Sequence, residues 1–136
     1  MSPKILVVDD EPDILLPILR GLKLRRIEVD GFTNPLDALA IFSAGKYSLA
    51  ILDIALPELS GFQLARKLLS RDPKIKVSFL SSWPHFEISF KSEFPNLSQE
   101  RFLLKPISVD ELVRFVRLTL ENSGKKYQLS DIKRFV

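Results

Sequence analysis

The sequence predicts an α/β fold in which a doubly wound parallel sheet carries helices on both faces. Short apolar runs alternate with longer mixed segments along the 136 residues. Such alternating β–α units form parallel sheets with right-handed crossovers. Apolar residues make up 46% and charged residues 27% of the chain, which is the composition of a globular protein. The strands are expected at Ile5–Val8, Glu28–Phe32, Leu49–Leu52, Val77–Leu80 and Phe102–Leu104.

Two helices are expected in the first half of the chain. An acid at the cap position and Pro12 directly after it predict the start of a helix that runs to about Arg25. Acids are favoured at the N-cap, and proline is favoured at the first helical position. Pro17 should kink this helix or break its hydrogen-bond ladder locally. Asn34 as the cap and the proline after it predict the start of a second helix in the same way, and Gly45 is expected to end this helix.

Capping boxes predict two further helices. Ser60 and Gln63 begin a helix that runs to about Arg71, and Ser108 and Glu111 begin another that reaches about residue 122. Each pair offers a hydroxyl and a side-chain acceptor three residues apart, which satisfies backbone donors at a helix start.

The segment from Trp83 to Arg101 has no single interpretation. A helix over residues 84–94 fits the alternation of the other units, and we adopt it. Its apolar residues fit an extended segment equally well, and Pro95 breaks whatever precedes it.

Polar residues follow the strands at their carboxyl ends, where ligand sites of open α/β sheets lie. Three carboxylates packed together repel one another, and a divalent cation relieves that repulsion. An all-oxygen ligand set suits Mg²⁺, and a lysine beside it can neutralise a phosphoryl oxygen. This combination suits in-line phosphoryl transfer to an aspartate. The residues are Asp9, Asp10, Asp53, Ser81, Ser82 and Lys105.

Four motifs in this order resemble the response-regulator receiver domain, which histidine kinases phosphorylate on aspartate in two-component signalling. The resemblance covers about residues 4–122 and implies a CheY-like, flavodoxin-like sheet of order 2-1-3-4-5. The motifs are Ile5–Pro12 (ILVVDDEP), Leu52–Gly61 (LDIALPELSG), Leu80–Ser82 (LSS) and Phe102–Pro106 (FLLKP).

The resemblance implies a role for each matching residue. Asp53 is the phosphoacceptor, and Lys105, which precedes a cis peptide to Pro106, contacts the phosphoryl oxygens. Ser81 and Phe102 are the switch residues that move when the aspartate is modified. Mg²⁺ is held by Asp9, Asp10, Asp53 and the backbone carbonyl of Ala55.

Simpler interpretations compete with several of these roles. Asp9 and Asp10 also suit a helix N-terminus, and Ser82 competes with Ser81 as the switch. Phe102 is equally an ordinary core residue. Trp83 either gates the site against water or is a partly buried loop aromatic.

The resemblance also implies partners. A sensor histidine kinase donates the phosphoryl group, and a downstream protein or an output domain outside this chain receives the signal. A homodimer through the fourth helix, fifth strand and fifth helix is implied as well. Phenylalanines in the fourth-helix region motivate an alternative, a receiver-like interaction module that works without phosphorylation. A stand-alone phosphatase ranks last, because Ala55 stands where its second acid belongs.

The distribution of charge along the chain suggests two parts, a receiver domain over residues 1–123 and a basic tail or linker over residues 124–136. The tail carries the whole net charge of +3, so the body is neutral and direct contact with nucleic acid is not expected. No apolar stretch approaches the roughly 20 residues of a membrane span, and no signal sequence is visible. We therefore expect a soluble cytoplasmic signalling protein without a membrane partner, and not an enzyme beyond its own phosphorylation and dephosphorylation.

Overall fold

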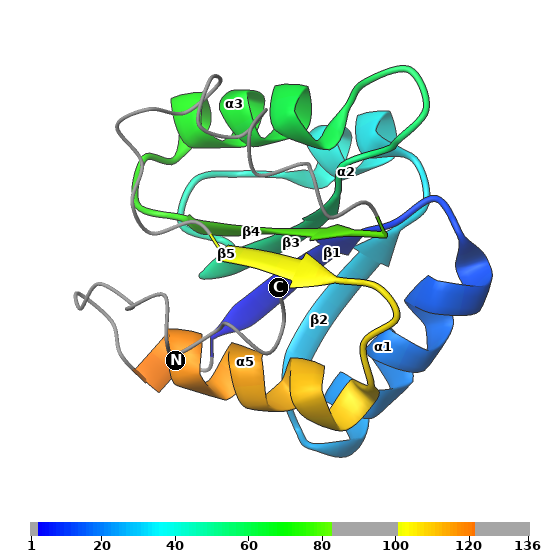
Figure 1. Cartoon of the computed structure of the whole chain (residues 1–136). Helices are drawn as coiled ribbons and strands as arrows, with labels where there is room; N and C mark the ends of the chain where they lie inside the picture. The colour runs from blue at the N-terminus through cyan, green and yellow to red at the C-terminus, as the bar shows by residue number, and fades with distance from the viewer. Residues whose placement is uncertain (1–2, 83–100, 122–136) are drawn as a thin grey trace.

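A five-stranded, fully parallel sheet of order β2-β1-β3-β4-β5 forms the centre of the structure (Figure 1). The computed structural model describes residues 3–82 and 101–121. The predicted fold and strand order are confirmed, and each observed strand overlaps its predicted run. The strands are β1 (Lys4–Val8), β2 (Glu28–Phe32), β3 (Leu49–Asp53), β4 (Lys76–Ser81) and β5 (Arg101–Leu104).

Helices cover both faces of the sheet (Figure 1). One face carries α2 (Pro35–Ile41) and α3 (Gly61–Arg71), and the other carries α1 (Pro12–Leu24) and α5 (Val109–Glu121). The side chains of β1 alternate between the two layers, with Leu6 in the core under α2 and α3. Its neighbour Ile5 lies in the core under α1 and α5. Because both cores are apolar, consecutive residues of the central strands are all hydrophobic in the sequence.

The first helix begins as predicted, with an acid at its N-cap and Pro12 in its first turn. Glu11 is the N-cap residue, and its side chain makes no capping hydrogen bond. Instead, the Glu11 N–H donates to Asp9 Oδ1 at 2.9 Å. Pro17 lies inside α1, yet the helix continues through it to Leu24. Because proline has no N–H, the hydrogen bond that residue 17 would donate is missing, which is the local break in the ladder that we predicted.

The second helix is shorter than expected. It ends at Ile41, because Phe42 adopts extended backbone angles and buries its ring against Tyr47. Gly45 lies in the turn that follows, with φ of +84°, and is not the helix terminator that we expected. Core packing of Phe42 therefore ends this helix before the glycine is reached.

Both predicted capping boxes bring hydroxyl and side-chain partners together. Ser60 Oγ accepts from the Gln63 N–H, and the Ser60 N–H donates to Gln63 Oε1. The Glu111 N–H donates to Ser108 Oγ at 3.1 Å, and that hydroxyl donates to the Glu111 carboxylate. These contacts set the starts of α3 and α5.

The predicted fourth helix, Trp83 and the basic tail lie outside the described residues. Within the parts of the chain that are described, no helix has the length and apolar character needed to cross a membrane.

Candidate functional site

Strand register brings the predicted polar residues to one edge of the sheet. Val8 of β1 pairs with Leu52 of β3, so the residues that follow them, Asp9 and Asp53, emerge side by side. Asp53 in turn pairs with Leu80, the residue before Ser81. The Lys105 N–H donates to the Ser81 carbonyl at 2.8 Å, which anchors the lysine just beyond β5. The bond before Pro106 is cis, as the resemblance implied.

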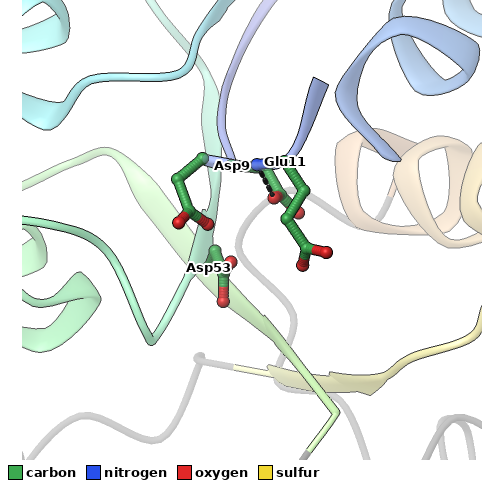
Figure 2. Close-up of side chains that lie close together, drawn as sticks. Asp9, Glu11 and Asp53 are labelled. Carbon is green, nitrogen blue, oxygen red and sulfur yellow. Dashed lines mark hydrogen bonds between the residues drawn. The ribbon is translucent and has the colours of Figure 1, made fainter. Parts of the chain in front are cut away.

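The Lys105 ammonium group lies at the centre of this edge. Its Nζ is 2.9 Å from Asp9 Oδ2 and 3.2 Å from Asp53 Oδ2. It is also 3.2 Å from Glu11 Oε1. Figure 2 shows the three carboxylate side chains lying close together, with the hydrogen bond from the Glu11 backbone to Asp9. The lysine that follows β5 therefore contacts carboxylates from two other segments of the chain, the one after β1 and the end of β3.

Glu11 was not predicted as a site residue. The structure places its carboxylate with those of Asp9, Asp10 and Asp53, each offering an oxygen within 4.8 Å of the others. Asp9 and Asp53 are buried, whereas Asp10 and Glu11 are exposed. Glu11 is the third acid in succession after β1, and that run was the only sequence signal for its place here.

Burial is the main influence on the Asp53 carboxyl group. Together with repulsion from Asp9, it raises the pKa of Asp53 to about 6, although Lys105 and the Ala55 N–H act in the opposite direction. For Lys105, burial alone would lower the pKa. The acceptors on Asp9, Asp53 and Glu11 outweigh that effect, so its pKa is raised. The lysine therefore stays charged, and Asp53 is ionised above about pH 6.

The loop after β3 is held close to the start of α3. Asp53 Oδ1 accepts from the Ala55 N–H at 3.2 Å, and the Gly61 N–H donates to the Ile54 carbonyl at 2.9 Å. A Cβ at Gly61 would lie 2.2 Å from the Asp53 carbonyl oxygen and 2.8 Å from Ile54 Cα. Only glycine fits so close to the backbone of Asp53 and Ile54. A larger residue at position 61 would therefore displace the backbone that carries the Asp53 side chain.

The predicted switch residues occupy different environments. Ser81 is buried at the end of β4, at the same edge as Lys105. Ser82 is exposed and lines, together with Lys105 and Pro106, a cavity of about 490 Å³ beside α1. Phe102 lies in the core under α3, where its ring stacks on Phe79 at 6.0 Å between centroids. This packing agrees with the core interpretation of Phe102.

The chain belongs to the response regulator receiver domain family, because the model of that family matches residues 5–117. Receiver domains are signalling modules of two-component systems, and phosphorylation and Mg²⁺ binding are general features of the family. Receiver domains generally use Mg²⁺ at an acidic pocket, and a cluster of acidic residues is present at the carboxyl edge of this sheet.

Curated relatives include longer proteins. The chain is 30% identical over 123 residues to the transcriptional regulatory protein PrrA of Mycobacterium bovis, covering 90% of this chain and 52% of PrrA. It is 32% identical over 120 residues to the transcriptional regulatory protein PcoR of Escherichia coli, covering 88% of this chain and 52% of PcoR. The chain thus spans about half the length of these relatives.

Solved receiver structures share the fold. The response regulator DrrB of Thermotoga maritima, an OmpR/PhoB homologue, matches with a TM-score of 0.77 at 28% identity. That match covers 94% of this chain and 57% of DrrB. A CheY-like receiver domain protein of Methanospirillum hungatei matches with a TM-score of 0.80 at 24% identity, over 90% of this chain and 97% of the other. The second likeness concerns the fold alone.

Proposed function

We propose that Asp53 accepts a phosphoryl group in the presence of Mg²⁺ and that the modified domain signals to a partner protein. The observation that carries this proposal is the Lys105 ammonium group held between the buried carboxylates of Asp9 and Asp53, at 2.9 Å and 3.2 Å. The donor is a sensor histidine kinase or a small phosphodonor. A downstream protein or an output domain outside this chain receives the signal.

The carboxylate cluster fits a magnesium ion. It offers only oxygen atoms, and Asp9 Oδ2 accepts no directed hydrogen bond from the described residues, although it forms a close ion pair with Lys105. Mg²⁺ prefers a few carboxylates and keeps open positions for water and phosphate oxygens. Asp9, Asp10, Asp53 and the Ala55 carbonyl would hold the ion. When bound, it would neutralise charge on the transferring group.

The transfer is a displacement at phosphorus. A carboxylate oxygen of Asp53 attacks the phosphorus atom, a P–O bond forms, and the bond from phosphorus to the donor nitrogen or oxygen breaks. The leaving group takes that electron pair, and an acyl phosphate remains on Asp53. Because the pKa of Asp53 is about 6, its carboxylate is ionised and nucleophilic at neutral pH. Lys105 supplies a fixed positive charge for the phosphoryl oxygens.

The signal would begin at the neighbouring strand end. Ser81 is buried beside the edge that carries Lys105, so its hydroxyl is placed to respond to a phosphoryl group on Asp53. Phe102 would respond by repacking against Phe79, its present ring neighbour. Such a change alters the populations of two packed states of one surface.

The mass of the intact protein tests the proposal. Incubation with acetyl phosphate and Mg²⁺ should add one phosphoryl group to the wild type, and EDTA should abolish the gain. Asp53→Asn should gain no mass, whereas Asp37→Asn, which changes an exposed acid in the first turn of α2, should gain it normally. An unmodified wild type, or an equal gain in Asp53→Asn, would refute the proposal. The first of these results would favour the phosphorylation-independent interaction module.

A further inference from the structure

We propose that Glu11 is a displaceable counter-ion of Lys105, which gives up its contact with the lysine when a phosphoryl group arrives at Asp53. This inference rests on the proposed function of Asp53. It concerns a contact that spans 94 residues of sequence, between the third acid after β1 and the residue after β5.

The first step of the argument is that three carboxylates already surround the Lys105 ammonium group. It donates hydrogen bonds to Glu11 Oε1 and Asp53 Oδ2, both at 3.2 Å, and forms an ion pair with Asp9 Oδ2 at 2.9 Å. An ammonium group carries three N–H donors. A phosphoryl oxygen that approaches Nζ therefore competes with three carboxylate oxygens within 3.2 Å, and the carboxylate that is held least firmly gives way.

The second step identifies the carboxylate that withdraws. The side chains of Asp9 and Asp53 are 1% and 6% exposed, so neither can exchange the lysine for water. The Glu11 side chain is 59% exposed, and exposed ion pairs contribute little stability. Its release would cost the least of the three.

The third step is that Glu11 can withdraw without disturbing the helix. Its main chain is held by the hydrogen bond from its N–H to Asp9 Oδ1, and its side chain makes no capping bond to α1. The carboxylate can therefore swing into water while the backbone stays in place. Lys105 is then free to donate to a phosphoryl oxygen on Asp53.

This arrangement predicts two effects of opposite sign for Glu11→Gln, which keeps the shape and removes the charge. The phosphoryl analogue beryllofluoride should bind more tightly at saturating Mg²⁺, by roughly two- to fivefold, because Lys105 no longer has to leave an anion. Mg²⁺ itself should bind more weakly, by about two- to fivefold, because the cluster of four carboxylates loses one charge. Damage to the site would weaken both.

Calorimetric titrations of the whole chain test this. Mg²⁺ is titrated into the metal-free protein, and beryllofluoride is then titrated at saturating Mg²⁺. Asp13→Asn is the matched control, because it removes an exposed acid two residues further on, and among the described residues Lys105 pairs with Asp9, Glu11 and Asp53 and not with Asp13. Its two affinities should stay within about twofold of the wild type.

Three other results would contradict this inference, and the last of them would also contradict the proposed function. If the wild type binds beryllofluoride and Glu11→Gln binds it equally well or more weakly, this inference is overturned. The proposed function would still stand. An equal gain in Asp13→Asn would also overturn it, because general charge would then explain the effect. A wild type that binds neither Mg²⁺ nor beryllofluoride would overturn both proposals.

Discussion

Replacing Asp53 by asparagine should stabilise the metal-free protein above pH 7 and have little effect near pH 4. Burial and the neighbouring Asp9 raise the pKa of Asp53 from 3.8 to about 6. Between these two values the folded protein keeps a proton that the unfolded chain has lost. The free energy of unfolding of the wild type should therefore fall as the pH rises from about 4 to about 6.

The size of the effect follows from the same two values. Each tenfold change in proton affinity corresponds to about 1.4 kcal/mol, so ionising Asp53 in the fold costs about 3 kcal/mol at neutral pH. Asparagine avoids this cost and can still accept from the Ala55 N–H through its carbonyl oxygen. Its amide NH₂ would face the Lys105 ammonium group, which offsets part of the gain. We expect a net stabilisation of about 1–3 kcal/mol at pH 8.

Urea unfolding in EDTA, followed by circular dichroism between pH 4 and pH 8, measures this difference. The wild type should lose stability across that range, whereas Asp53→Asn should lose clearly less. Added Mg²⁺ should then stabilise the wild type more than the variant, because the ion binds the folded carboxylates. Asp37→Asn serves as the exposed control and should follow the wild type. An Asp53→Asn protein less stable than the wild type at pH 8 in EDTA would refute this account of the site.

Two further substitutions test the packing around the site. Gly61→Ala places a Cβ 2.2 Å from the Asp53 carbonyl oxygen, so we expect about 1–3 kcal/mol less stability in urea and slower phosphorylation by acetyl phosphate. Gly45→Ala, at φ of +84° in open space, should lose about 1 kcal/mol with an unchanged phosphorylation rate, and a matching slowdown would contradict the argument. Phe102→Ala should lose about 3–5 kcal/mol in urea unfolding, because its ring stacks on Phe79 in the core, and a loss below about 1 kcal/mol would argue against a core role.

The fold was predictable because its signals are local and repeated. Runs such as Ile5–Val8 are apolar at every position, which in a parallel sheet places alternate side chains in two different cores. Capping residues such as Ser60 mark a helix start through contacts within one turn. The end of α2 was not predictable in this way, because Phe42 leaves the helix to pack against Tyr47.

The sequence by itself determined which edge of the sheet carries the chemistry. Parallel strands end at a common edge, so Asp9, Asp53 and Lys105 had to meet there once the strands were identified. Only the tertiary structure decided how the charges are shared. Glu11 reaches Lys105 because its side chain turns back from the helix start toward the end of β5, and burial, not sequence spacing, sets the pKa of Asp53. Reach and desolvation depend on what surrounds a side chain in space, and neighbours in the sequence do not reveal that.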